Sequence, residues 1–216
     1  NVLVIGAGWI GLEVAAAARK RDANATVIEL ADRVCARALT PEMSAWVHEL
    51  HVSHGVDIRL SAAFDHFEGD GKLQRAVLGD GTAIPCDVAV VGIGLIPNTE
   101  LAEQAGLSID NGIVVDEHGQ TSHPDIFSAG DVTNHPNALL GRRVRLESWE
   151  NAQNQGINAA KAMLGTMQPY AEIPWFWSDQ YDANIQMMGL PENWDETVIR
   201  GDRNAGEFIE SVSYTH

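Results

Sequence analysis

The sequence is poor in basic residues, in cysteine and in long apolar runs. It has 14 Lys and Arg against 30 Asp and Glu, a formal net charge of −16, which argues against nucleic acid and against an anionic membrane as partners. The two cysteines, Cys35 and Cys86, are too few for a disulfide framework, so we expect a reducing compartment, the cytoplasm. No apolar run approaches the roughly 18 residues that a membrane-spanning helix needs.

The composition is otherwise that of a folded globular chain, with 45% hydrophobic and 20% charged residues among 216. The sequence starts without Met, directly on the apolar, β-branched residues 2–5, which are typical of a parallel strand covered on both faces. A domain seldom begins at the first residue of a central strand. We therefore expect this chain to be an interior piece of a longer protein.

Residues 1–94 alternate between strands and helices, with a meander inserted before the last strand. Thr40 is the expected N-cap of the second helix, because Pro41 follows it at the first helical position. This order predicts a Rossmann-like, doubly wound α/β domain that binds a dinucleotide. The expected strands are 2–5, 25–30, 56–60 and 87–91, the helices 10–19 and 41–54, and the hairpin 73–84.

Two further parts follow this domain. In residues 95–168 the pattern predicts a short helix at 99–105, strands at 112–116 and 126–129, and a long helix at 148–164. In residues 169–216 it predicts short strands at 185–188, 197–200 and 208–212. This last part is typical of the beginning of a separate α+β domain.

A glycine motif, GAGWIG, lies between the first strand and the first helix. Its residues are Gly6, Ala7, Gly8, Trp9, Ile10 and Gly11. Gly6 permits a tight turn, Gly8 lets a pyrophosphate approach the backbone, and Gly11 lets helix and strand pack closely. The helix N-terminus offers N–H groups to the phosphates. Glu29, at the end of the next strand, is placed to accept hydrogen bonds from the adenosine ribose and to repel a 2′-phosphate.

Two arginines, Arg33 and Arg37, follow Glu29. An NADP site would place an arginine where Glu29 stands, so the acid favours NAD. A cluster of turn glycines beside a surface glutamate is the alternative for the whole motif. A solvated charge at a helix edge is the alternative for Arg37.

Two weaker glycine features come later in the chain. Gly92 and Gly94 lie in a glycine-spaced exit from a strand, and Gly130 and Asp131 end an apolar stretch. An aspartate in such a place can direct its carboxylate at a ribityl or ribose hydroxyl. Ordinary turns are the alternative for both features.

Aromatic and histidine residues also suggest sites. Trp175 and Trp177 are two residues apart in an extended segment, so they face the same side and could meet a flat cofactor; a domain-interface core is the alternative. His48, His51 and His54 share a helix face. No carboxylate or cysteine is spaced to complete a metal site with them, so we expect a solvated helix face and no metal.

Five stretches together resemble one family, the FAD-dependent ferredoxin–NAD reductases of bacterial aromatic-ring dioxygenase and haem monooxygenase systems. They are VLVIGAGWIGLEVAA, VVGIGLIPN, DIFSAGDV, ESWENAQNQG and PWFWSDQY. The resemblance covers essentially the whole chain. The last two stretches are specific, whereas the first three are shared with disulfide reductases and related flavoproteins.

The resemblance implies an FAD domain split by an inserted NAD domain and followed by an interface domain. The chain would then hold the NAD domain (1–94), the second half of the FAD domain (95–168) and the start of the interface domain (169–216). The first FAD-binding GxGxxG is expected upstream. Contacts with NAD are implied for the glycine motif, Glu29, Arg37, Glu13 and Gly94. Contacts with FAD are implied for Asp131 and, beside the isoalloxazine, for Trp177, Trp175 and Trp149.

The implied reaction takes a hydride from NADH to FAD and passes single electrons to a 2Fe–2S ferredoxin that feeds an oxygenase. No side chain is expected to act as acid or base. The basic residues at 141–145 are a candidate surface for docking the ferredoxin, with a solvated basic turn as the alternative. The rival functions are a disulfide-type flavoprotein reductase and a non-catalytic NAD-binding fragment.

Overall fold

The structure is a computed structural model that describes residues 1–214. The described chain forms two compact units: residues 1–94, 178–185 and 191–214 make the first, and residues 95–177 and 186–190 the second. The division after Gly94 coincides with the first predicted domain boundary. The predicted boundary after residue 168 stays a prediction, since both units contain residues from the C-terminal part.

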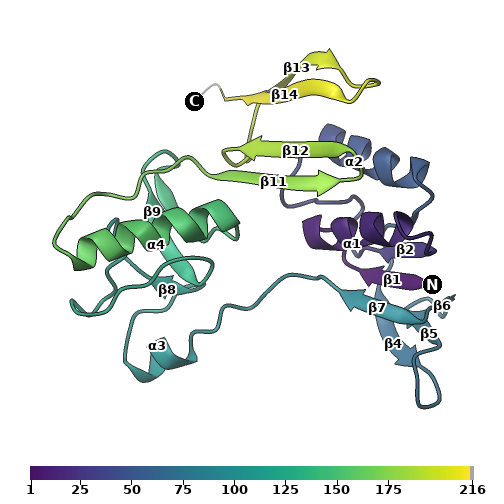
Figure 1. Cartoon of the computed structure of the whole chain (residues 1–216), viewed down its shortest axis with the longest axis horizontal. Helices are drawn as coiled ribbons and strands as arrows, with labels where there is room; N and C mark the ends of the chain where they lie inside the picture. Colours follow the sequence, from purple (N-terminus) through teal and green to yellow (C-terminus); the bar gives the residue numbers. More distant parts are fainter. Residues whose placement is uncertain (215–216) are drawn as a thin grey trace. The chain divides into compact units, whose positions relative to one another are not determined.

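The first unit is built on a four-stranded parallel sheet in the order β3-β2-β1-β7 (Figure 1). Its strands are β1 (Val2–Ile5), β2 (Ala25–Ile28), β3 (Asp57–Arg59) and β7 (Val88–Val91). The chain moves from β1 outward to β2 and β3, and then returns to the other side of β1. The carboxyl ends of β1 and β7 therefore form a topological switch point, where doubly wound sheets bind ligands. The predicted fold class is confirmed.

Two helices connect these strands, α1 (Trp9–Arg19) and α2 (Pro41–Ser53). The small side chains of α1 let it pack closely on the sheet, and Leu12 is fully buried. The predicted cap of α2 is confirmed, because Thr40 Oγ1 accepts a hydrogen bond from the backbone N–H of Met43 at 3.1 Å.

A three-stranded antiparallel meander is inserted between β3 and β7. It comprises β4 (Phe64–Glu68), β5 (Arg75–Leu78) and β6 (Ala83–Pro85). The hairpin β5–β6 was predicted, and Asp80 closes its turn by accepting the backbone N–H of Thr82 at 2.8 Å. Strand β4 was missed because its sequence, FDHFE, is largely exposed. The inner face of the meander shares a core with β1 and β2 through Ala76, Leu78 and Ile84.

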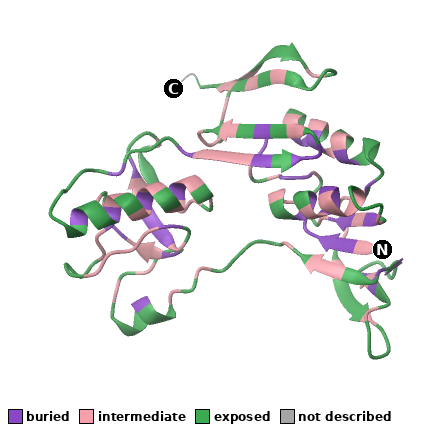
Figure 2. Cartoon of the chain, in the orientation of Figure 1, coloured by how far each residue is buried: buried purple, intermediate pink, exposed green. Residues whose placement is uncertain are grey.

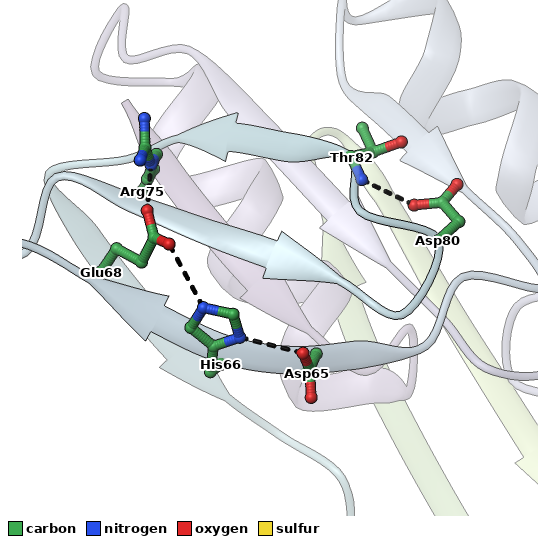
Figure 3. Close-up of polar contacts among 6 residues, drawn as sticks. All are labelled: Asp65, His66, Glu68, Arg75, Asp80 and Thr82. Carbon is green, nitrogen blue, oxygen red and sulfur yellow. Dashed lines mark hydrogen bonds and ion pairs between the residues drawn. The ribbon is translucent and has the colours of Figure 1, made fainter.

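The outer face of the meander carries a chain of ionic contacts (Figure 3). His66 lies between Asp65 and Glu68, at 2.9 and 3.3 Å, and Glu68 also pairs with Arg75. Hydrogen bonds that His66 donates to the carboxylates of Asp65 and Glu68 raise the pKa of His66, and the Arg75 guanidinium lowers the pKa of Glu68. All of these groups are solvated, so they contribute little to stability.

The second unit contains a three-stranded sheet, β10-β9-β8, and two helices. Its elements are α3 (Glu100–Gln104), β8 (Ile113–Val114), β9 (Thr133–Asn137), β10 (Arg142–Val144) and α4 (Trp149–Met163). The predicted strand at 126–129 is wrong, since Phe127 makes only an isolated bridge with Gln120. Strands β9 and β10 follow Gly130 instead. They were missed because β9, TNHPN, buries polar side chains rather than apolar ones.

Helix α4 follows the predicted bounds, and Ser148 caps it by accepting the backbone N–H of Asn151 at 3.3 Å. A narrow stripe along α4 is buried, while the rest of the helix is intermediate or exposed (Figure 2). The stripe consists of Asn151, Gln155, Ala159 and Ala162. This i, i+4 spacing is that of one helix face.

Two β-hairpins complete the described chain. They are β11 (Trp175–Gln180) with β12 (Ala183–Met188), and β13 (Glu196–Asp202) with β14 (Glu207–Ser213). All three predicted C-terminal strands lie within them. Across residues 1–214, no helix is long and apolar enough to cross a membrane.

Candidate functional site

The turn after β1 is crowded at two of its glycines and open at the third. A Cβ on Gly6, whose φ is +101°, would lie 2.4 Å from the carbonyl oxygen of Gly92. A Cβ on Gly11 would lie 2.1 Å from the carbonyl oxygen of Gly6, whereas a Cβ on Gly8 would meet nothing within 4 Å. Gly6 and Gly11 therefore serve the packing of strand against helix, and Gly8 leaves backbone accessible to a ligand.

The N-terminus of α1 begins at this open glycine. Gly8 is the N-cap, no side chain caps the helix, and its first turn contains no acidic residue. The first intrahelical bond runs from the Leu12 N–H to the Gly8 carbonyl. Helical N–H groups that precede it point out of the helix at its positive end. Such an end, at the carboxyl edge of a parallel sheet, suits a pyrophosphate.

Glu29 connects the end of β2 to the glycine turn. Its Oε2 accepts the backbone N–H of Ala7 at 2.7 Å, and its Oε1 accepts the backbone N–H of Ala31 at 2.9 Å. Each carboxylate oxygen can accept a further hydrogen bond. The sequence predicted Glu29 as a ribose acceptor. The structure adds that the Ala7 N–H fixes this carboxylate to the glycine turn.

The two arginines after Glu29 have different surroundings. The Arg33 guanidinium donates to the carbonyls of Leu39 and Ala36 at 2.8 and 2.6 Å, so it holds its own loop together. Arg37 is exposed, and its Nη2 lies 3.6 Å from where a Cβ on Gly94 would stand. The structure thus brings Arg37 and Gly94 together near the carboxyl end of β7. Arg33, by contrast, packs within its own loop.

Glu13 lies on α1, two residues after Gly11. Its Oε1 accepts a hydrogen bond from the Ser178 hydroxyl at 2.5 Å, although the two residues are 165 positions apart in the sequence. Ser178 is buried in β11. Sequence reasoning missed Ser178. The available signal was its place in the PWFWSDQY stretch, immediately after Trp177.

The second unit has a turn with an unpaired buried amide. The Gly130 N–H donates to Gln155 Oε1 at 2.6 Å, and Gly130 has a φ of +85°. Gln155 Nε2 is buried and has no hydrogen-bond partner among residues 1–214. Beside this turn, partial burial and Glu147 raise the pKa of Asp131, against the opposing effect of Arg145. Gln155 therefore brings an orphaned amide donor to the turn at Gly130, and the Asp131 carboxyl group comes next in the sequence.

Three tryptophans of the second unit form one aromatic group. Trp175 and Trp177 stack with ring centroids 5.0 Å apart, and Trp149 meets Trp177 edge-on at 5.9 Å. Trp149 is 65% exposed, so the group presents aromatic surface to the outside. Trp175 and Trp177 thus lie on the same side of β11, as predicted.

The basic residues at 141–145 are mostly engaged within their own unit. Arg143 Nη2 donates to the carbonyls of Val115 and Asn134, both at 2.5 Å. Arg145 lies 2.7 Å from Glu147 and also donates to the carbonyl of Asp131. Arg143 and Arg145 thus have structural roles, which weakens the expectation of a docking surface made by all three arginines.

The expected solvated histidine face of α2 is wrong for His51. This side chain has no exposed surface, and its Nε2 lies 2.5 Å from Gln180 Oε1. His51 is buried because it shares the inward face of α2 with Ser44 and Val47, at i, i+3 and i+7 spacing. Within residues 1–214, no group of three His, Cys, Asp or Glu is arranged to hold a metal ion.

Burial gives His51 a pH-dependent effect on stability. Burial lowers the pKa of His51, an effect that its bond to Gln180 opposes. In the unfolded chain His51 gains a proton near pH 6.5, whereas in the folded chain it does so only at lower pH. The free energy of unfolding is therefore unaffected by this group above about pH 6.5 and decreases below that pH. Between pH 6.5 and 5.5, wild type should lose about 1 kcal/mol more than His51→Gln. Denaturant titrations at both pH values measure this; equal losses would contradict it.

Comparison with known proteins identifies the family. Residues 1–156 match the pyridine nucleotide-disulphide oxidoreductase family, and residues 175–215 match the reductase C-terminal family. The chain belongs to the pyridine nucleotide-disulphide oxidoreductases. The reductase C-terminal match begins at Trp175, the first residue of β11.

Individual relatives narrow the similarity. The ferredoxin–NAD(+) reductase component of the anthranilate 1,2-dioxygenase system of Burkholderia cepacia is 49% identical over 96% of this chain and 51% of its own length. The ferredoxin reductase for the CYP199A2 system from Rhodopseudomonas palustris matches with a TM-score of 0.95 and 40% identity, over 99% of this chain and 53% of that structure. The covalent putidaredoxin reductase–putidaredoxin complex matches with a TM-score of 0.94 and 42% identity, over 99% and 52%.

These matches confirm the resemblance that the five sequence stretches indicated. The chain spans about half the length of the curated relatives it matches.

Proposed function

We propose that the protein to which this chain belongs transfers electrons from NADH, through FAD, to a 2Fe–2S ferredoxin that serves an oxygenase. The observation that carries the NADH half is the Glu29 carboxylate, held by the Ala7 N–H inside an otherwise uncapped glycine turn. The ferredoxin half is supported by two relatives that are named ferredoxin reductases and by the similarity to a putidaredoxin reductase solved in complex with putidaredoxin.

The residues present fit NAD. Gly8 and the N-terminus of α1 would take the pyrophosphate, because that end of the helix has open space and no acidic residue. Glu29 would accept the adenosine ribose hydroxyls and disfavour a 2′-phosphate. Gly94 would lie toward the nicotinamide end, where Glu13 would accept a hydrogen bond from the carboxamide. The exposed Arg37 side chain, whose tip lies beside Gly94, would have to move to contact the adenosine end.

The residues of the second unit fit part of an FAD site. Asp131 would accept ribityl hydroxyls, and the orphaned Gln155 Nε2 offers a donor at the same turn. The tryptophan group, Trp149, Trp175 and Trp177, would cover the isoalloxazine and exclude water from it. When bound, FAD supplies the exchange of one hydride for two single electrons, so the chain's own residues bind and orient rather than act as acid or base.

The cysteines of this chain do not suit a disulfide reductase. Cys35 is buried, and burial followed by the Glu29 charge raises the pKa of its thiol to about 12. Burial also raises the pKa of Cys86. A thiol held protonated is a poor nucleophile. Any redox-active pair would have to lie outside this chain, and two free thiols support a reducing cytoplasm as the compartment.

The proposal is tested by an anaerobic titration of the full-length protein with NADH and with NADPH, followed in the visible flavin band. We expect NADH to bleach the band at a concentration at least about tenfold lower than NADPH, since a carboxylate facing a 2′-phosphate costs more than about 1.4 kcal/mol. Reduction of a 2Fe–2S ferredoxin should follow. A missing flavin band, or one that NADH leaves unchanged, would contradict the proposal and favour a non-catalytic NAD-binding protein.

A further inference from the structure

We propose that a buried chain of hydrogen bonds orients the Glu13 carboxylate toward the nicotinamide carboxamide of NAD(H), and that its members are positioning residues for hydride transfer. The members, from the far end inward, are Tyr181, His51, Gln180 and Ser178. All of them lie in the first unit. The inference rests on the proposed function, because it takes Glu13 as the acceptor for the carboxamide.

Four consecutive contacts make up the chain of hydrogen bonds. Ser178 Oγ lies 2.5 Å from Glu13 Oε1, and Gln180 Nε2 lies 3.1 Å from Ser178 Oγ. His51 Nε2 lies 2.5 Å from Gln180 Oε1, and the Tyr181 hydroxyl lies 3.2 Å from His51 Nδ1. Residues from α1, α2, β11 and the turn after β11 are thereby linked.

Only one arrangement of protons satisfies all four contacts with neutral His51. An ionised Glu13 only accepts, so Ser178 must donate to it and must in turn accept from the Gln180 amide N–H. The Gln180 oxygen can then only accept, which places the His51 proton on Nε2. His51 Nδ1 is left to accept from Tyr181. Every bond donates toward Glu13, and hydrogen bonds aligned in this way polarise and strengthen one another.

The middle of the chain of hydrogen bonds is closed to water, and Tyr181 at its far end is 9% exposed. His51 and Gln180 have no exposed surface, and Ser178 has 1%. Burial lowers the pKa of His51 and raises that of Tyr181, which favours the neutral imidazole and the protonated phenol that the proton arrangement uses. Losing one donor would leave its buried partner unsatisfied. The bonds therefore hold each other in one arrangement.

The far end of the chain is fixed by further contacts. The Tyr181 ring stacks on His54 with centroids 3.7 Å apart, and Lys20 Nζ donates to the Tyr181 carbonyl at 2.7 Å. Tyr181 has a φ of +58°, which a tyrosine seldom adopts without compensating contacts. The charged or titratable groups around His51 are His48 on its own helix, His54 at the C-cap of that helix, and Tyr181. Beyond Tyr181 lie Arg19 at the end of α1 and Lys20 at its C-cap.

The near end is an exposed carboxylate on the helix that begins at the glycine turn. A glutamate on a helix surface normally samples many rotamers, and ordering it on binding opposes affinity. Here Ser178 holds Oε1 in advance, and the same bond does not use Oε2. An oriented carboxylate oxygen is the acceptor that a primary carboxamide N–H requires, and ligands without a nicotinamide would gain nothing from it.

The test is ligand binding to the full-length protein by calorimetry, with two probes. One is 1,4,5,6-tetrahydro-NAD, which has the carboxamide but cannot give a hydride; the other is ADP-ribose, which has no nicotinamide. We expect Ser178→Ala to weaken binding of the first probe by about 5–10-fold and that of ADP-ribose by less than about twofold. Glu13→Gln should act in the same way. The double variant should be no worse than Glu13→Gln alone, because the two residues act as a unit.

Ser44→Ala is the matched control. Ser44 is as buried as Ser178, at 1% exposure, and donates to the Val34 carbonyl at 2.6 Å, away from Glu13. It should lower the melting temperature and leave the ratio of the two affinities unchanged. Tyr181→Phe, which keeps the ring and removes only the hydroxyl, should shift the same ratio by about twofold and carries the comparison if Ser178→Ala does not fold.

Equal losses for both probes, or additive losses in the double variant, would overturn the proposal and leave the hydrogen-bond chain a purely structural link between β11 and the two helices. Because neither probe transfers electrons, this outcome can occur while NADH still bleaches the flavin. Failure of the positioning chain is therefore distinguishable from failure of the proposed function.

Discussion

Replacing Gly11 by alanine is expected to destabilise the dinucleotide-binding unit, whereas replacing Gly8 is expected to leave it folded and to abolish tight NAD(H) binding. A Cβ on Gly11 would stand 2.1 Å from the backbone carbonyl of Gly6, and backbone cannot rotate away. We expect Gly11→Ala to cost about 3 kcal/mol of unfolding free energy. The nearby Gly6→Ala should be at least as harmful, since its φ of +101° adds strain to the clash with Gly92.

Gly8→Ala is the matched variant with the opposite effect. Gly8 has an extended backbone, with a φ of −79°, and open space around its Cβ position. Its substitution should cost no more than about 1 kcal/mol, the difference between glycine and alanine at an N-cap. The added methyl group would occupy the space over the helix N-terminus. Losing one charge-assisted bond to a phosphate corresponds to about 1.5–3 kcal/mol, or about 10–100-fold in Kd.

Thermal unfolding and NAD(H) titrations of the full-length protein separate the two effects. Gly11→Ala should lower the melting temperature without ligand, and Gly8→Ala should lower only the increase in melting temperature that NAD(H) produces. Wild-type binding by Gly8→Ala would place the pyrophosphate elsewhere. An unchanged melting temperature in Gly11→Ala would contradict the close approach of α1 to β1.

The sequence was most informative where one segment determines its own structure. Strand β1, the glycine turn and the Thr40 cap follow from residues within a few positions of each other, and all three are as predicted. It was least informative where polar side chains form the interior. Strand β9 carries the buried polar residues Thr133, Asn134, His135 and Asn137, which no apolar periodicity reveals.

The same contrast applies to the candidate site. The glycine motif and Glu29 lie within 29 residues and could be identified from spacing alone. The hydrogen-bond chain behind Glu13 could not, because Gln180 and His51 are 129 positions apart and neither residue type is unusual on its own. His51 lies on α2 at the spacing of a buried face, with Ser44 and Val47, whereas its residue type favours a solvated position. A polar residue on an inward helix face predicts a buried partner, which only the fold supplies.

Glu29→Ser is expected to remove the preference for NADH over NADPH. The carboxylate stands at the adenosine end of the proposed site, fixed by the N–H groups of Ala7 and Ala31. A like charge opposite a 2′-phosphate costs several kcal/mol, so removing it should lower the NADH-to-NADPH ratio of kcat/KM by about 100-fold. Leaving the two backbone donors unpaired should also cost about 1–3 kcal/mol of stability.

Steady-state reduction of ferricyanide by the full-length protein measures the ratio, and two further variants locate its cause. Asp32→Asn removes a charge from the exposed part of the same loop and should change the ratio much less, since solvent screens exposed charges. Arg37→Ala in the Glu29→Ser background should reverse the gain in NADPH activity, because Arg37 is an exposed guanidinium in the loop that follows Glu29 and can pair with a 2′-phosphate once the carboxylate is gone. An unchanged ratio in Glu29→Ser would mean that the carboxylate only braces the glycine turn. In that case, cofactor choice would have to come from elsewhere in the protein.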